Sequence, residues 1–543
     1  MIRTERCHGP SLPRPVGRPT DTTGSTDNTD STGNAGTINS TGNAGSTGTT
    51  ATRSTRPRVH DSHPPPRGPT SPLPEVELPA TPLARLEHLV GAERLAEVHG
   101  ALREARERLD GREVWHVSDN PTRGGVAELL RATLPHMRGE GIDTRWATIE
   151  GSRAFRALTK ALYYRMCGVA AHAHEDPPTP EGGRALYERM SRAAAERLLG
   201  VMGRRSVVVL HDHQTAGLIP YLREAGCTVL WQCHIGAPLH AEPAGPAWQF
   251  LRRYLSAAHG FIASYDGALP VGLPDVPVRI LSPSINPLSP KNLPLRPAVD
   301  TSRLMARIGV FREPSGADAD PSGGFAFADP LLRHTARIDR HAGALPAGTP
   351  LVTQVSRWDR VKDIPGVIEA FTDHVDPDFG AHLLLVGPRA AGDAQAEQVL
   401  AECREARERR RNRPGRVHLV EIPTDHPTEH ALTINAIQRC STVVIQKSLA
   451  EGFGLTVSEA AWKGRPVIAS PVGGIRQQIR HGRSGLLLNH PHDLPGLGAG
   501  IDRLLADPAY ARELGDNGRR HVRTNFLTDS GVLGFARILC ELP

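Results

Sequence analysis

The stretch 446–475, QKSLAEGFGLTVSEAAWKGRPVIASPVGGI, opens on a short apolar run, TVVIQKS, and contains a second, RPVIAS, and each run is typical of a buried β-strand. Glu451 stands in a glycine-interrupted loop, and Glu459, separated from it by seven residues, falls in a predicted helix that begins near Gly454. The Pro and Gly residues at 471–474 predict a turn after the second strand. A strand, a turn and a helix N-terminus together predict a phosphate-binding site. The two carboxylates beside it are suited to bind sugar hydroxyls.

Similar apolar runs recur along the chain in two series, with helical patterns between them. This alternation is typical of parallel sheets covered by helices. The sequence therefore predicts an α/β fold with two facing Rossmann-like domains and a cleft between them. The first series comprises residues 112–119, 206–212, 228–235, 261–264 and 278–281, and the second 351–359, 382–388, 417–423, 442–448, 466–470 and 485–488.

The chain of 543 residues is too long for one ordinary hydrophobic core. Residues 1–75 are rich in Thr, Ser, Gly, Asn and Pro, and such a segment buries too little apolar surface to offset its ordering entropy, so we predict a disordered tail. The remaining divisions that we expect are an N-terminal Rossmann-like domain at 76–300, a linker with an insertion at 301–350, a C-terminal Rossmann-like domain at 351–525 and a C-terminal helix at 526–543.

Charge and cysteine content narrow the classes of partner. A net charge of +6 is small for this length, so no nucleic-acid partner is implied, and the basic run 404–416 lacks interleaved aromatics and favours a solvated helix face. The 7 cysteines show no CxxC spacing, which favours the reduced cytoplasm. No apolar run has the length of a membrane span, so we expect no membrane association.

Polar residues follow several of the predicted strands, and the carboxyl ends of parallel strands are where binding sites form. The loop from Asn120 to Gly125 ends in two glycines, which permits close approach of a ligand but is equally compatible with a plain turn. His211 and Asp212 close one strand and His234 the next. A single histidine is more often a hydrogen-bonded structural residue, but two at successive strand ends favour a site.

A further strand is followed by Arg357 and Lys362. Two cations at a strand end are suited to neutralise a diphosphate leaving group as its bond breaks. The sequence has no DxD pair and no His/Cys spacing for a metal ion, so we expect a metal-independent reaction. No GxGxxG follows a strand, which disfavours a dinucleotide-dependent oxidoreductase.

Several of these segments, taken together, resemble the trehalose synthases of the glycosyltransferring type, which belong to family 4 of the retaining glycosyltransferases. The resemblance spans roughly residues 110 to 530 and is carried by HDHQTAGLIPYL, WQCHIG, SPSINPLSPKN, QVSRWDRVKDIPGVIEAF and the stretch that contains Glu451 and Glu459. It implies the two-domain GT-B fold, with 76–300 as the acceptor-side domain and 351–525 as the nucleotide-sugar-binding domain, and no cofactor beyond the nucleotide-sugar substrate. It also implies transfer of glucose from ADP- or UDP-glucose to free glucose, in a cytoplasmic enzyme whose partners are small molecules, with a homodimer left open.

The resemblance also implies a role for each matching residue. The catalytic residues would be Arg357 and Lys362, which grip the diphosphate, Glu451, which reads the glucose hydroxyls, and His234, which meets the transferred sugar. Glu459 would bind the ribose. The other donor-binding residues would be Gly125, Lys447, Phe453, Gly454 and Leu455, and the acceptor pocket would be walled by His211, Asp212 and Gln214.

Two positions depart from the family pattern on the acceptor side. Gly236 stands where the family has an aspartate in its Cys-His-Ile-Asp run, and Asn286 replaces the aspartate of SIDPLS. These departures leave open a related retaining transferase that uses a sugar phosphate or a polyol as acceptor. A non-catalytic nucleotide-sugar sensor is a further alternative, which the complete set of Arg357, Lys362, Glu451 and Glu459 disfavours.

Overall fold

A computed structural model of the chain provides the coordinates. The described residues are 73–122, 124–168, 180–235, 244–270, 272–296, 301–312, 336–339, 343–409 and 414–542. Almost all of the predicted disordered tail, Gly236 and the PSGADADPSGG part of the predicted insertion lie outside them. No described helix is long and apolar enough to cross a membrane.

The first sheet has six parallel strands in the order β2-β1-β3-β4-β5-β6. All five predicted strands form. The sequence analysis missed β2, because its segment TRWAT has only two apolar residues, flanked by polar ones, and so lacks an apolar run. The strands are β1 (Val114–Ser118), β2 (Thr144–Thr148), β3 (Val207–His211), β4 (Thr228–Cys233), β5 (Gly260–Ala263) and β6 (Val278–Ile280).

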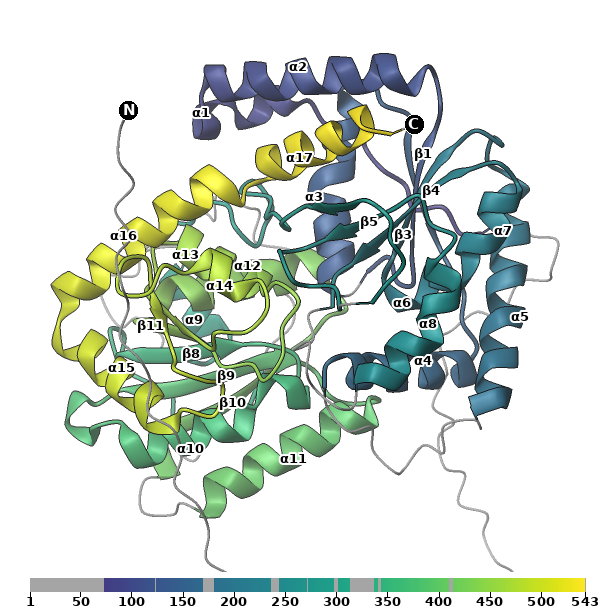
Figure 1. Cartoon of the computed structure of the whole chain (residues 1–543). Coiled ribbons are helices and arrows are strands. Elements are labelled where there is room, and N and C mark those ends of the chain that lie inside the picture. The colour runs from purple at the N-terminus through teal and green to yellow at the C-terminus, as the bar shows by residue number, and fades with distance from the viewer. Residues whose placement is uncertain are drawn as a thin grey trace, which may run out of the picture. The chain divides into compact units, whose positions relative to one another are not determined.

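Helices cover both faces of this sheet (Figure 1). One face packs against α4, α5 and α8, and the other against α2, α3 and α17, the last of which comes from the end of the chain. The helices of this half are α1 (Glu87–Val90), α2 (Ala92–Leu109), α3 (Gly125–Gly139), α4 (Arg153–Met166), α5 (Pro180–Leu199), α6 (Asp212–Thr215), α7 (Ile219–Glu224) and α8 (Ala244–Leu255), with 3-10 turns η1 (Leu83–Leu86) and η2 (Ala216–Leu218).

The second sheet has seven strands in the order β13-β12-β11-β8-β9-β10-β7. Six are parallel, and β7 at the edge pairs antiparallel with β10. Each of the six strands predicted for this half therefore forms. The bounds are β7 (Arg337–Asp339), β8 (Leu351–Val355), β9 (His382–Pro388), β10 (Val417–Ile422), β11 (Val443–Gln446), β12 (Val467–Ala469) and β13 (Leu486–Leu487).

Its helices also lie on two faces: α10, α11, α15 and α16 contribute to one buried cluster, and α9, α12 and α13 to clusters on the other side. The helices in the remaining part of the chain, including α17, which packs on the first sheet, are α9 (Ser302–Arg307), α10 (Ile364–His374), α11 (Ala394–Arg409), α12 (Pro427–Cys440), α13 (Leu455–Trp462), α14 (Ile475–Gln478), α15 (Leu494–Ala506), α16 (Pro508–Asn525) and α17 (Thr528–Cys540), with 3-10 turns η5 (Arg360–Lys362), η6 (Pro377–Phe379) and η7 (Pro414–Arg416).

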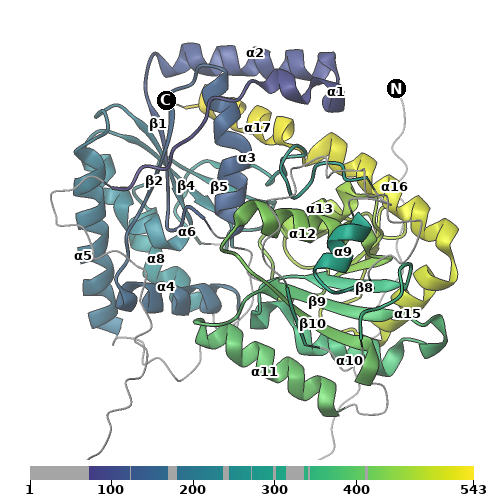
Figure 2. The same cartoon turned by 180° about the vertical axis from the view of Figure 1, so that it is seen from behind.

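The described parts of the segment predicted as a linker, 301–350, contain elements of the second sheet's fold. Helix α9 packs on α12, as the view from behind shows (Figure 2), and β7 extends the sheet. Strand β7 also explains why the basic run after residue 404 is only partly a solvated face. Arg404 and Arg407 both bind the carboxylate of Asp339, at 2.7 and 2.9 Å, and Arg407 is buried.

The last helix returns to the first half of the chain, in agreement with the prediction that the C-terminal segment is helical and docks on a domain. Helix α16 packs on α13 of the second half, whereas α17 packs on α2 and α3 of the first (Figure 1). Val532, Phe535 and Leu539 enter the same buried cluster as Val98 and Leu102 of α2. An apolar contact therefore holds α2, near the start of the described chain, against α17 near its end.

Candidate functional site

The loop that carries Glu451 is held by the glycine turn that follows β12. Gly473 has a φ of +51°, and a Cβ added there would lie 1.7 Å from the carbonyl oxygen of Glu451, so no other residue fits. The N–H of Gly474 donates to the carbonyl of Gly452 at 3.0 Å. The two ends of the 446–475 stretch are thus packed directly on each other, which fixes where the Glu451 carboxylate lies.

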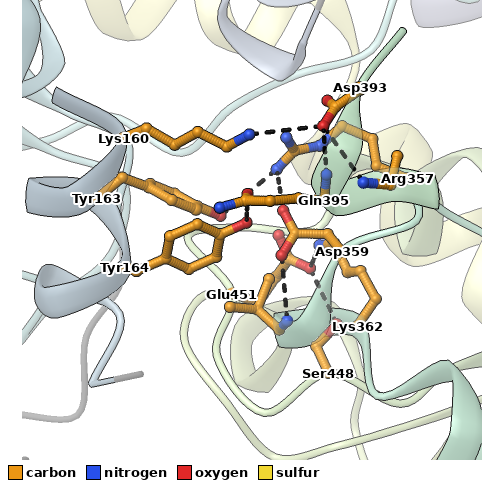
Figure 3. A network of polar contacts seen from close by, with 12 residues as sticks. Lys160, Tyr163, Tyr164, Arg357, Asp359, Lys362, Asp393, Gln395, Ser448 and Glu451 are labelled. Atoms are coloured by element: carbon orange, nitrogen blue, oxygen red, sulfur yellow. Dashed lines mark hydrogen bonds and ion pairs between the residues drawn. The ribbon is translucent and has the colours of Figure 1, made fainter. Parts of the chain in front are cut away.

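Lys362 and Glu451 form an ion pair in which both side chains are largely buried, with exposed fractions of 12% and 14% (Figure 3). Lys362 ends the η5 turn that follows β8, and Glu451 follows β11, so two neighbouring strands bring them together. The same carboxylate oxygen accepts hydrogen bonds from Ser448 at 3.2 Å and Gln446 at 3.4 Å. Because an ammonium has three N–H donors, Lys362 can bind Glu451 and an anionic ligand together.

Lys447 is fully buried and forms an ion pair with Asp363, the residue after Lys362. Asp363 holds the left-handed backbone conformation, with φ +41°, which is costly for a residue other than glycine. Gln354 ties the same segments together by donating to the Lys362 carbonyl at 3.0 Å and accepting from the Lys447 N–H at 3.0 Å. These contacts tie Lys447 to the loop that presents Lys362. That Lys447 contacts the donor stays a prediction.

Arg357 follows β8, and its side chain is 59% exposed. One guanidinium nitrogen lies 3.0 Å from the carboxylate of Asp359 and 3.5 Å from the hydroxyl of Tyr163 (Figure 3). The guanidinium has further N–H groups, so these contacts leave donors for a phosphate.

Helix α4 of the first half contributes Tyr163 and two neighbours to this network. The Tyr164 hydroxyl donates to Gln395 at 2.8 Å, and Lys160 lies 3.6 Å from Asp393 (Figure 3). The sequence analysis did not identify these residues. An adjacent pair of tyrosines in an amphipathic helix is typical of core packing, and nothing local in the sequence shows that α4 reaches Arg357.

Glu459, the second carboxylate of the opening stretch, is buried in α13 and has two differently placed oxygens. Oε1 lies 3.0 Å from the ammonium of Lys291, which is also 2.9 Å from Glu128 of α3. Burial alone would lower the pKa of Lys291, but the two carboxylates outweigh it and raise that pKa above its usual value. Oε2 of Glu459 has no hydrogen-bond partner among the described residues, so it is free to accept from a ligand hydroxyl.

The predicted phosphate-binding residues come from both halves and meet. Gly125 begins α3, and a Cβ built on it would lie 3.8 Å from Leu455, the first residue of α13. Gly454 caps α13 with a φ of +85°, so the N-terminus of this helix is unobstructed by a side chain at that position. The Phe453 side chain is buried in the apolar cluster below, and therefore only its backbone faces outward from that cluster.

On the predicted acceptor side, Asp212 follows β3 with a φ of +61°, an unusual conformation for a residue with a side chain. Its carboxylate accepts from the backbone N–H of His234 at 2.7 Å, and its carbonyl accepts from the indole of Trp231 at 2.9 Å. Burial raises the pKa of Asp212 to about 7. Asp212 therefore joins the ends of β3 and β4, where His211 and His234 lie.

Two residues of β1 and its following loop belong to this group and were not singled out from the sequence. Asp119 accepts from Gln214 at 3.3 Å, and burial raises the pKa of the Asp119 carboxyl. His116 lies within β1, with its Nδ1 at 3.0 Å from Nε2 of His211. Both occur in the predicted strand 112–119, but nothing local in the sequence shows that this strand lies beside β3, as it does in the structure.

Asn286, one of the two departures from the family pattern, is engaged in a local turn. Its side-chain oxygen accepts from the N–H of Leu288 at 2.9 Å, and its carbonyl accepts from Ser289 at 2.9 Å. An aspartate makes the same turn contact, since both residues supply an oxygen acceptor at that position. The replacement therefore preserves the backbone of the segment that presents Lys291.

Two helix-covered sheets, with cations and carboxylates at the carboxyl ends of their parallel strands, place the chain in the GT-B class of glycosyltransferases. The chain resembles the solved structure of sucrose-phosphate synthase from Thermosynechococcus elongatus, with a TM-score of 0.56, 18% identity, and coverage of 79% of this chain and 98% of that one. The family model for the N-terminal domain of trehalose synthase matches residues 116–269, and that for group 1 glycosyl transferases matches 336–521.

Relatives that match along nearly their whole length identify the family within this class. The chain is 31% identical to trehalose synthase of Pyrococcus horikoshii over 454 residues, covering 84% of this chain and 95% of the relative. It is also 31% identical to trehalose synthase of Rubrobacter xylanophilus over 449 residues, covering 82% and 94%. The chain therefore belongs to the trehalose synthase family, and it is a glycosyltransferase of trehalose metabolism.

Proposed function

We propose that this protein transfers glucose from a nucleoside diphosphate-glucose, ADP- or UDP-glucose, to free glucose and so forms trehalose. The observation that carries the proposal is the set of charged groups around the Glu451 loop. Lys362 and Arg357 supply positive charge for a diphosphate, and Glu451 and Glu459 supply carboxylates for the sugar hydroxyls. Membership of the trehalose synthase family supports the same reaction.

In this reaction the bond between C1 of glucose and the diphosphate oxygen breaks, and C1 acquires positive charge. Lys362 and Arg357 stabilise the negative charge that develops on the leaving group. The anomeric hydroxyl of the acceptor attacks C1 from the same face, and its proton passes to the leaving phosphate oxygen. The protein then needs no separate general base, and its contribution is to orient the two sugars and neutralise charge.

The acceptor is the less constrained substrate, because Gly236 lacks the carboxylate that the family pattern has there. A sugar phosphate or a polyol is therefore the second candidate acceptor. Asn286 does not add to this alternative, since its side chain caps a local turn. The donor half of the site is the same for either acceptor.

The test is to incubate the purified full-length protein with ADP-, UDP- or GDP-glucose and, separately, glucose, glucose 6-phosphate or glycerol. We expect a disaccharide that resists borohydride reduction, formed only with free glucose, together with release of the nucleoside diphosphate. A product formed only with glucose 6-phosphate or glycerol replaces the proposed acceptor. Hydrolysis of the donor without transfer, or tight donor binding without turnover, contradicts the proposal.

A further inference from the structure

Three histidines at the first sheet, of which His116 and His211 are buried and His234 is half-buried, form a continuous hydrogen-bonded row that ends at the predicted sugar-binding residue His234. His116 Nδ1 lies 3.0 Å from His211 Nε2, and His211 Nδ1 lies 2.9 Å from His234 Nε2. The rings are stacked, with centroids 5.3 and 5.2 Å apart and interplanar angles of 18° and 21°. His116 lies in β1, His211 ends β3 and His234 directly follows β4, and these three strands are adjacent, so the row crosses the sheet.

A neutral imidazole carries one N–H and one bare nitrogen, so the direction of every hydrogen bond in the row is linked to the others. If His116 donates from Nδ1, then His211 accepts at Nε2 and donates from Nδ1, and His234 accepts at Nε2. If instead His234 donates from Nε2, every bond reverses. Only these two arrangements give both hydrogen bonds with all three rings neutral. Burial keeps them neutral, since it lowers the pKa of each ring below its usual value.

The far end of the row decides between the two arrangements. His116 Nε2 is buried and has no hydrogen-bond partner among the described residues. The phenyl ring of Phe535, from α17, packs against this imidazole at a centroid distance of 5.1 Å and supplies no oxygen or nitrogen. An unpaired buried N–H is rarer and costlier than an unpaired acceptor. His116 therefore keeps Nε2 bare and carries its proton on Nδ1.

We propose that His116 and His211 are positioning residues that fix His234 in the Nδ1–H tautomer, so that His234 presents a hydrogen-bond donor, and not an acceptor, to an oxygen of the transferred sugar. That His234 meets the sugar rests on the proposed function, whereas the tautomer of the row does not. No contact of His234 Nδ1 with another described residue is recorded, which leaves this N–H for a ligand.

In this row each histidine ring is hydrogen-bonded to another imidazole and not to a carboxylate. A carboxylate behind His234 would favour a protonated, cationic ring, as such partners do elsewhere. A neutral row instead delivers a directed N–H without adding positive charge next to C1, where positive charge develops as the diphosphate leaves. Lys362 and Arg357 supply the positive charge on the other side, at the leaving group.

The first test is neutron diffraction on deuterium-exchanged wild-type crystals without any substrate. The expected result is a deuteron on Nδ1 and none on Nε2 in all three rings. Deuterons on Nε2 throughout, or two on any one ring, overturn the proposal. This measurement needs no activity, so it decides the tautomer even if the proposed transfer to glucose is wrong.

The second test compares His116→Leu with His116→Asn, because an Asn side chain keeps an N–H donor close to the place of Nδ1 and Leu does not. We expect His116→Leu to lower kcat about tenfold, the effect of one misdirected hydrogen bond, with little change in KM for the nucleotide sugar. His116→Asn should recover most of this loss. Equal kcat losses in two variants of equal thermal stability contradict the positioning role, and if His116→Leu does not fold, the diffraction result alone decides.

Discussion

Lys362 forms an ion pair with Glu451, and in the proposed reaction its ammonium also neutralises the diphosphate. We predict that Lys362→Ala and Arg357→Ala each lower turnover by about 10² to 10³, through loss of leaving-group stabilisation. Steady-state kinetics with whichever of ADP-, UDP- or GDP-glucose the assay proposed above shows to be the donor measure the effect. Near-normal kcat in both variants would remove the basis of the proposed mechanism.

Arg360 is a matched control for these two substitutions. It lies in the same η5 turn but binds Glu402 of α11, away from Glu451. Arg360→Ala should therefore leave kcat within about twofold of wild type, since this half-exposed pair contributes little and involves no proposed substrate-binding residue. A loss as large as that of Lys362→Ala would show that the turn, and not the Lys362 charge, is responsible.

The sequence was informative about residues whose chemistry is visible in one local pattern. Glu451 and Glu459 were found from their spacing around a helix start, and Lys362 from its place after a strand. His116, Asp119, Lys291 and Tyr163 were not found, because each becomes part of the site only through a partner distant in the chain. Lys291 is an example: nothing near it in SPKN indicates two carboxylates from α3 and α13.

At the scale of elements, Lys291 links α3 to α13 through Glu128 and Glu459. We predict that Lys291→Met raises KM for the nucleotide sugar about tenfold or more, because Glu459 then loses the ammonium that neutralises and positions its buried carboxylate. Glu128→Gln is the control, since it removes only the more exposed of the two carboxylates. An unchanged KM in Lys291→Met, with normal folding, contradicts a role for Glu459 in donor binding.

Two ion pairs join α2 to α17, and they differ in burial. Arg94 binds Asp529, whose side chain is buried and has one oxygen without a partner, whereas Arg537 binds Glu97 and is 61% exposed. Arg94→Ala should lower the free energy of unfolding by about 2 to 3 kcal/mol, because it leaves a buried carboxylate unpaired.

The exposed pair provides the comparison for this helix contact. Arg537→Ala should change the free energy of unfolding by less than about 0.5 kcal/mol, as expected for an ion pair in water. Denaturant unfolding of the two variants in parallel measures both values. If both variants lose the same stability, burial of Asp529 is not the reason for the loss.

For the whole molecule, the sequence predicted the α/β class, both parallel sheets and nearly all strands, because buried parallel strands appear as unbroken apolar runs. It missed β2 and β7, which are an edge strand and a three-residue antiparallel strand with polar residues. It also could not assign α17 to the first sheet. That contact depends on which apolar surface is left uncovered after the whole chain has folded, and no local pattern contains this information.

Four histidines in and next to the first sheet, His116, His211, His213 and His234, should make the stability of the whole protein sensitive to acid. Burial lowers the pKa of His116 to about 3 and of His213 and His234 to about 4, from 6.5 when exposed, and also lowers that of His211. Between pH 6.5 and about 4 the unfolded chain therefore binds more protons than the folded one, so stability falls as pH decreases through this range.

Asp212 acts in the opposite direction, because its pKa is raised from 3.8 to about 7 and the folded state binds the extra proton as pH falls. The four histidines outnumber it, so we expect the free energy of unfolding to fall between pH 6.5 and 5 in urea titrations. His213→Gln should reduce the slope of the free energy of unfolding against pH by up to about 1.4 kcal/mol per pH unit, which corresponds to one proton. The reason is that Gln can keep the hydrogen bond from Nε2 to the Thr159 carbonyl but does not titrate. Asp212→Asn should steepen it. Stability that is constant or rises toward pH 5 would mean that the histidine row is accessible to protons in the folded protein.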